Sequence, residues 1–136
     1  MEQDVRWKQR FEYLDKALHR LHEAVQGTLQ EPKNHLYQIA LVGAFQFTFE
    51  LSWKTMKDYL AYQGIDVSVP RDVIKQAFHY QLIQDGDIWI HMLEERNLMA
   101  HVYQEPAALI AGKNIRERYV HAIEQLHRYL LEKRKV

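Results

Sequence analysis

The chain of 136 residues contains no cysteine, no excess of either charge and no long hydrophobic run. The absence of cysteine excludes disulfides, cysteine-based zinc sites and thiol catalysis, and it suits a reducing cytosol. Eighteen basic side chains balance eighteen acidic ones, so binding of nucleic acid or an anionic membrane would need a local patch. No apolar run approaches the roughly 18 residues of a membrane span. We therefore expect a single domain over residues 1–136 in a soluble, cytoplasmic protein that uses no membrane, cofactor or metal.

Apolar residues recur at helical spacing near the start of the chain. The pattern predicts a helix from about Val5 to Gln26, and Gly27 is expected to stop it. Its apolar stripe consists of Trp7, Phe11, Leu14, Leu18, Leu21 and Val25.

A second, central helix is predicted from Asn34, a good N-cap, to Gln63-Gly64, where glycine suits the left-handed C′ position. The segment FQFTFELSW also alternates with a strand-like period. Its unbroken length and the Phe45/Phe49/Trp53 spacing favour a helix that is buried on several sides.

Three further helices complete the predicted fold. Pro70 opens a short one, whose inward residues are Val73, Ile74, Ala77 and Phe78. After a break at Asp85-Gly86-Asp87, a fourth carries on one stripe Trp89, Leu93, Arg96, Ala100 and Tyr103. Pro106 starts a fifth, whose inward residues are Ile115, Tyr119, Ala122, Leu126 and Tyr129. We expect an all-α fold, an antiparallel up-down four-helix bundle with one short additional helix.

The segment RNLMAHVY gathers four polar side chains at the end of the fourth predicted helix. On a helix Arg96 and Tyr103 are nearly eclipsed, whereas Asn97 and His101 are neighbours. The Asn97 carboxamide could hold the His101 ring in one orientation, as an acid or a base requires. Arg96 and His101 lie about 140° apart around a regular helix, so one chain does not easily direct both at the same atom.

Shared work between two protomers would suit a phosphodiester substrate. Cleavage of RNA without a metal needs a base for the 2′-OH, an acid for the leaving oxygen and a cation for the developing charge. One histidine cannot be base and acid at the same instant, but a two-fold homodimer supplies two. The spacing alone carries no weight, since RERYVH repeats it at Arg116 and His121. An alternative interpretation is that Arg96 caps the helix C-terminus and His101 is structural. The protein would then act only as an interaction scaffold.

The segments FQFTFELSWKTMKDYL, YQGI, PRDVIKQAF and MLEERNLMAHVY resemble the nucleotidyltransferase substrate-binding proteins, a branch of the HEPN superfamily. The resemblance covers nearly the whole chain and implies a dimeric helical bundle that pairs with a minimal nucleotidyltransferase (MNT) as toxin and antitoxin. HEPN toxins are typically metal-independent ribonucleases with an R-x4-6-H motif, which Arg96 and His101 match, with Asn97 at the usual polar position. In some toxins a tyrosine in R-x4-H-x-Y is adenylylated by the partner, which silences the toxin, and Tyr103 matches that tyrosine.

The resemblance also leaves a second function open, because the older family name implies a non-catalytic subunit that binds a substrate for a nucleotidyltransferase. Glu50 and Lys54, in ELSWK, either line a functional cleft or form an ordinary i,i+4 ion pair. His19, His22 and Glu23 have helical metal-ligand spacing but need further ligands. Several arginines either form a local RNA-binding patch or lie on solvated helix faces: Arg6, Arg10, Arg116, Arg118 and Arg128.

Overall fold

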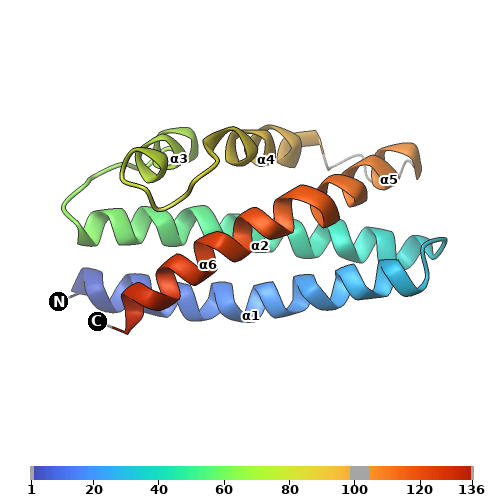
Figure 1. Ribbon diagram of the computed structural model, residues 1–136, viewed down its shortest axis with the longest axis horizontal. Helices are drawn as coiled ribbons and strands as arrows, with labels where there is room; N and C mark the ends of the chain where they lie inside the picture. Colours follow the sequence, from blue (N-terminus) through green and yellow to red (C-terminus); the bar gives the residue numbers. More distant parts are fainter. Residues whose placement is uncertain (1, 99–104, 136) are drawn as a thin grey trace.

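The computed structural model describes residues 2–98 and 105–135, and every regular element within them is helical. The elements are α1 (Glu2–Gln30), α2 (His35–Tyr62), α3 (Pro70–His79), α4 (Gly86–Leu98), α5 (Glu105–Asn114), the π-helical η2 (Ile115–Tyr119) and α6 (Val120–Arg134). Figure 1 shows α1, α2, α4 and the continuous α5–η2–α6 segment running alternately in opposite directions, with both termini at the same end. The predicted antiparallel bundle with a short additional helix is confirmed. In the described part of the chain, no helix is both long and apolar enough to cross a bilayer.

Helix α1 is longer than predicted, because Gly27 does not stop it. Gly27 lies within the helix, and its carbonyl accepts a hydrogen bond from the Glu31 amide at 2.9 Å. A Cβ atom at this position would lie 3.5 Å from the ring of Tyr37, so the glycine lets the first residues of α2 pack closely. The helix ends at Gln30 because Pro32 disfavours helical geometry at the residue before it.

Helix α2 lies at the centre of the bundle, between α1 on one side and α3, α4 and α5 on the other (Figure 1). Asn34 caps it by accepting a hydrogen bond from the Leu36 amide at 2.9 Å. Gly64 follows its end with φ of +88°, as the predicted left-handed position requires. The rings of Phe45 and Phe49 are fully buried, which confirms the helix prediction over the strand alternative.

Helix α3 follows the prediction at Val73, Ile74 and Ala77, which are buried, but not at Phe78. The Phe78 side chain is 52% exposed. It lies over the backbone at the start of α4, where a Cβ atom on Gly86 would come within 3.3 Å of its ring. The glycine thus allows α4 to begin beneath an aromatic ring that periodicity alone would place in the core.

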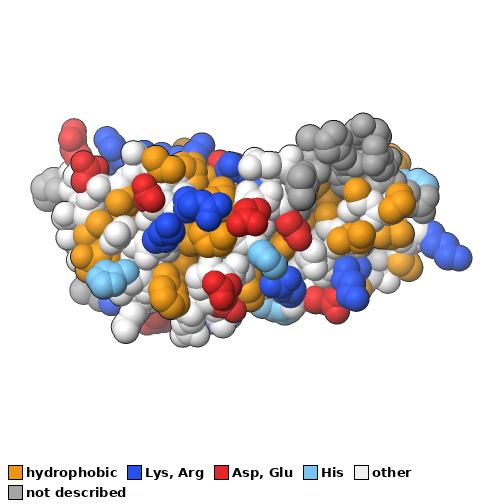
Figure 2. All heavy atoms as spheres, turned by 90° about the horizontal axis from the view of Figure 1, so that it is seen from above, with side chains coloured by type: hydrophobic (Ala, Val, Ile, Leu, Met, Phe, Trp, Pro, Cys, Tyr) orange, Lys and Arg blue, Asp and Glu red, His pale blue; other side chains and the backbone are white. Residues whose placement is uncertain are grey.

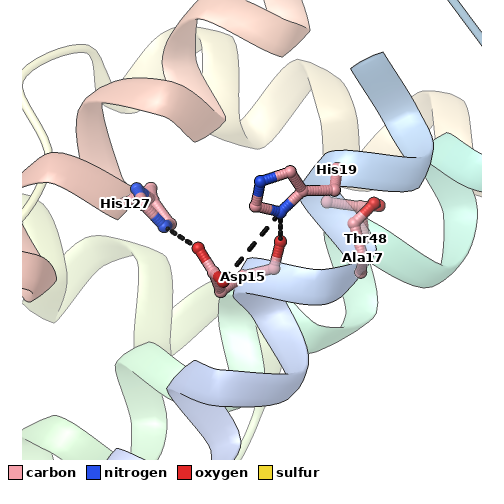
Figure 3. A network of polar contacts seen from close by, with 5 residues as sticks. All are labelled: Asp15, Ala17, His19, Thr48 and His127. Carbon is pink, nitrogen blue, oxygen red and sulfur yellow. Dashed lines mark hydrogen bonds and ion pairs between the residues drawn. The ribbon is translucent and has the colours of Figure 1, made fainter. Parts of the chain in front are cut away.

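A polar network joins α1 to α6 across the bundle. The carboxylate of Asp15 on α1 forms a hydrogen bond with His127 on α6, with 2.7 Å between Oδ1 and Nε2 (Figure 3). The ring of His19 lies beside the same residue, with Nδ1 2.8 Å from the Asp15 carbonyl oxygen. Nearby, the buried Thr48 hydroxyl donates to the Ala17 carbonyl at 3.3 Å, where α1 and α2 approach closely. These contacts give α6 a fixed register on α1.

Glu124 of α6 extends this connection, because His22 of α1 and His121 of α6 each lie about 3 Å from one of its carboxylate oxygens. His22 is therefore paired across the bundle, while Glu23 pairs with Arg20 on its own helix. Across residues 2–98 and 105–135, no three histidine or carboxylate side chains are arranged to hold a metal ion. The alternative of a metal site at His19, His22 and Glu23 is not supported by this arrangement.

Two buried tyrosines predict how the fold responds to alkaline pH. Burial, together with the neighbouring Tyr129, raises the pKa of Tyr59 to about 12, and burial with nearby Glu95 raises the pKa of Tyr119. Above pH 10 the unfolded chain, with a tyrosine pKa of 10.0, releases these phenol protons, whereas the folded state still keeps them. The stability that they contribute is present below pH 10 and is lost as the pH rises toward 12.

We expect the melting temperature to fall between pH 10 and 12, and to fall less in Tyr59→Phe and Tyr119→Phe. Thermal unfolding followed by circular dichroism measures this. Tyr13→Phe is the matched control, since Tyr13 is 60% exposed, and it should titrate like the parent protein. Equal slopes for all four proteins would contradict the assignment.

Candidate active site around Arg96

Arg96 lies in the last turn of α4 and reaches across to α2. Its Nη1 donates a hydrogen bond to Oε1 of Glu50 at 2.5 Å, and the two side chains are 25% and 34% exposed. The guanidinium also lies over the ring of Phe49, 5.8 Å from its centre. Charge-assisted hydrogen bonds of this kind contribute about 1.5–3 kcal/mol. Glu50 and Phe49 therefore fix the position of the arginine while leaving one face open to solvent.

The same glutamate connects Arg96 to a second cation. Oε2 of Glu50 accepts a hydrogen bond from the indole N–H of Trp53 at 2.9 Å. The ammonium of Lys54 lies over that indole ring, 6.0 Å from its centre. The alternative of an i,i+4 ion pair between Glu50 and Lys54 is wrong, because the glutamate pairs with Arg96 and Trp53 instead. Sequence reasoning missed this partner, since the two residues are 46 positions apart.

The junction of α5 and the π-helical η2 contacts the final turns of α4. Glu95, next to Arg96, accepts a hydrogen bond from Asn114 at 3.0 Å. One turn earlier, His91 lies 3.3 Å from Arg118 of η2. The Tyr119 ring is fully buried and stacks on Phe45, and its hydroxyl has no hydrogen-bond partner among the described residues. Asn114 of α5 and Arg118 of η2 thus contact the last two turns of α4, next to Arg96.

The remaining residues of the predicted motif differ in what the structure describes. Asn97 is exposed on α4 beside Arg96. His101 and Tyr103 lie outside the described residues, as does Ala100 of the predicted fourth-helix stripe. Within the described part, the arrangement offers one oriented guanidinium and one ammonium, with a single carboxylate between them. Such a site can bind an anion such as a phosphate.

The second R-x4-H pattern does not form a comparable site. Arg116 points toward the end of α1, with Nη1 3.5 Å from the Thr28 hydroxyl, whereas His121 pairs with Glu124 on α6. The two side chains thus serve different contacts. An R-x4-H spacing therefore does not by itself bring an arginine and a histidine to one site.

The arginines considered for an RNA-binding patch do not form one positively charged surface. Arg10 pairs with Asp58 at 3.1 Å, and Arg118 contacts His91 at the η2–α4 junction. The face seen in Figure 2 carries lysines and arginines interspersed with acidic side chains, together with hydrophobic groups over α5 at one end. Any interaction with RNA on this face must therefore depend on a few cations rather than on a broad positive potential.

Comparison with known proteins agrees with the fold. Residues 9–132 match the family model described as "Nucleotidyltransferase substrate binding protein like". A solved structure from Thermus thermophilus is 28% identical, with a TM-score of 0.75, and the match covers 83% of this chain and 94% of that one. A solved Haemophilus influenzae protein, described as the substrate-binding domain of a nucleotidyltransferase, shares the fold with a TM-score of 0.79, at 22% identity and covering 88% and 98%.

One curated relative extends the comparison to function. The "Probable ribonuclease HepT" of Haemophilus influenzae is 31% identical over 70 residues. The match covers 48% of this chain and 48% of that protein, so the chain spans about half the length of the curated relative.

Proposed function

Since the chain belongs to the nucleotidyltransferase substrate-binding-like family of HEPN proteins, we propose that it is a metal-independent endoribonuclease, the toxin of a toxin–antitoxin pair. The observation that carries this proposal is the R-x4-H-x-Y motif in a chain of the HEPN family. The arginine of the motif, Arg96, is held at the surface of α4 by its hydrogen bond to Glu50. The partial match to a probable ribonuclease supports the same activity.

The proposed reaction is transesterification within the RNA strand. A base removes the proton from the 2′-OH, and the oxygen attacks the adjacent phosphorus. The bond to the 5′-oxygen then breaks, and an acid protonates that leaving group. The products are a 2′,3′-cyclic phosphate and a 5′-hydroxyl. His101 is assigned as base or acid, Arg96 binds the phosphate oxygens, and Asn97 orients the imidazole.

The two roles of histidine require a second protomer, and an exposed apolar surface supports one. Leu36, Ile39 and Phe47 follow one another along α2 and are 74%, 47% and 45% exposed. Leu109 and Ile110 of the adjacent α5 are also half-exposed or more. We call these five residues the α2–α5 surface. These residues lead along α2 to Glu50, three residues beyond Phe47, and exposed apolar groups of this kind suit an interaction surface. We propose that it contacts a second copy and brings two Arg96 side chains to one groove.

The direct test uses the purified protein with single-stranded RNA in excess EDTA. We expect cleavage products that end in a 2′,3′-cyclic phosphate, identified by mass spectrometry. If the protein leaves RNA intact with and without EDTA, the ribonuclease proposal fails. An inert protein that still bound a nucleotidyltransferase would favour the non-catalytic subunit.

We propose that a partner MNT adenylylates Tyr103. In that reaction the phenol oxygen attacks the α-phosphorus of ATP, the α–β bond breaks and pyrophosphate leaves. The phosphate of the attached AMP would pair with the Arg96 guanidinium, and the bulk of the nucleotide would prevent RNA from binding there. After incubation with the partner and ATP, we expect the intact mass to rise by AMP units and the cleavage activity to fall.

Tyr103→Phe should gain no mass and remain active in the same incubation, while Tyr13→Phe, with its exposed aromatic ring on α1, should be modified like the parent protein. Labelling of Tyr103→Phe would assign the modification to another residue.

A further inference from the structure

The positive charge of Arg96 is already neutralised and so does not attract a polyanion. In the resting site Glu50 neutralises Arg96 through a direct hydrogen bond, and both side chains are partly buried. A phosphate that approaches the guanidinium therefore meets a neutral pair. The overall neutrality of the chain offers no long-range attraction to compensate.

Lys54 is the cation beside this neutral pair. It lies four residues after Glu50 on α2, so the two side chains share one face of the helix. In the described part of the chain, no carboxylate forms an ion pair with its ammonium. The Trp53 ring beneath the ammonium is itself fixed by its hydrogen bond to Glu50. The half-buried Lys54 side chain thus lies on the same face of α2 as Glu50, the partner of Arg96, and its charge is not neutralised by a described carboxylate.

We infer that Lys54 binds a phosphate of the RNA backbone next to the one held by Arg96. This inference rests on the proposed function, because it takes single-stranded RNA as the ligand. An ammonium on a flexible stem acts as a point charge and reads no sequence, so the contact should strengthen binding to all sequences alike.

The test measures binding separately from cleavage. A fluorescent single-stranded 2′-O-methyl oligonucleotide lacks the nucleophilic hydroxyl and cannot be cut by the proposed reaction. Fluorescence anisotropy at several salt concentrations gives the affinity and its salt dependence for the full chain. We expect Lys54→Ala and Lys54→Gln to bind about 5- to 10-fold more weakly. The slope of log affinity against log salt should become shallower by about 0.7, as for the loss of one single-strand phosphate contact.

Two further variants separate a phosphate contact from a structural role. Lys54→Arg should retain most of the affinity, because it keeps the charge over the Trp53 ring. Lys16→Ala removes an exposed lysine from α1 and should leave affinity and slope unchanged. If Lys54 only packs on Trp53, its loss would lower the melting temperature but not the salt slope, and the inference would be wrong.

Failure of this inference is distinguishable from failure of the proposed function. If the parent protein binds the uncleavable oligonucleotide but does not cut ordinary RNA, the ribonuclease proposal fails and Lys54 can still be assigned. If the parent protein does not bind the oligonucleotide, or if Lys54→Ala binds with the same affinity and slope, the Lys54 assignment is overturned.

Discussion

Arg96→Ala is expected to lower the rate of RNA cleavage by about 10²–10³-fold, and His101→Ala by about 10²–10⁴-fold. The first loss reflects a guanidinium that binds two phosphate oxygens and stabilises the charge that develops between them. The second reflects proton transfer, for which no other side chain of the motif substitutes. Single-turnover cleavage of a labelled RNA in EDTA measures both rates. If both purified variants cut RNA like the parent protein, the assignment of the motif is wrong.

The loss of Arg96 also leaves Glu50 without its cation, so a fall in activity needs a structural control. Arg96→Lys restores a positive charge beside the carboxylate but lacks the planar fork, and we expect it to recover stability more fully than activity. The second R-x4-H pattern provides a matched comparison. Arg116→Ala and His121→Ala remove residues at the same spacing whose contacts are with Thr28 and Glu124, and both should cut RNA at nearly the parent rate.

The helices could be predicted from the sequence because their signals are local. The Asn34 cap, the glycine after α2 and the spacing of Phe45 and Phe49 all act within a few residues, and the structure confirms each of them. Gly27 and Phe78 were predicted wrongly for the opposite reason. Their environments depend on Tyr37 and Gly86, which belong to neighbouring elements. A residue pattern along one helix cannot show what packs against it.

The candidate site shows the same limit more clearly. Periodicity places Arg96 on α4 and Glu50 on α2, but it gives no sign that the two side chains meet. ELSWK instead suggested a local pair between Glu50 and Lys54, which the structure replaces with the Arg96 contact. The π-helical segment that supports α4 is also invisible in the sequence, since it shifts the hydrogen-bond register without a proline or glycine. Such pairings arise only when distant segments pack.

Phe47→Glu is expected to dissociate the proposed homodimer and to lower RNA cleavage by about 100-fold or more. Phe47 lies at the end of the α2–α5 surface nearest Glu50, so in the proposed dimer the substitution would place a new carboxylate from each copy in the interface. Burying an unpaired charge in an interface costs several kcal/mol, enough to shift a dimer to monomers at micromolar concentration. Analytical ultracentrifugation gives the dissociation constant, and cleavage is measured on the same samples.

The effect should act through assembly and not through folding. Because Phe47 is already exposed in one protomer, Phe47→Glu should keep its helical content. Tyr13→Glu is the matched control, since it places the same charge at an exposed aromatic residue of α1, outside the α2–α5 surface, and it should remain dimeric and active. If catalysis requires two protomers, the specific activity of the parent protein must also fall on dilution below its dissociation constant. A Phe47→Glu protein that stays dimeric would move the interface elsewhere, while a monomer with full activity would show that each protomer carries a complete site.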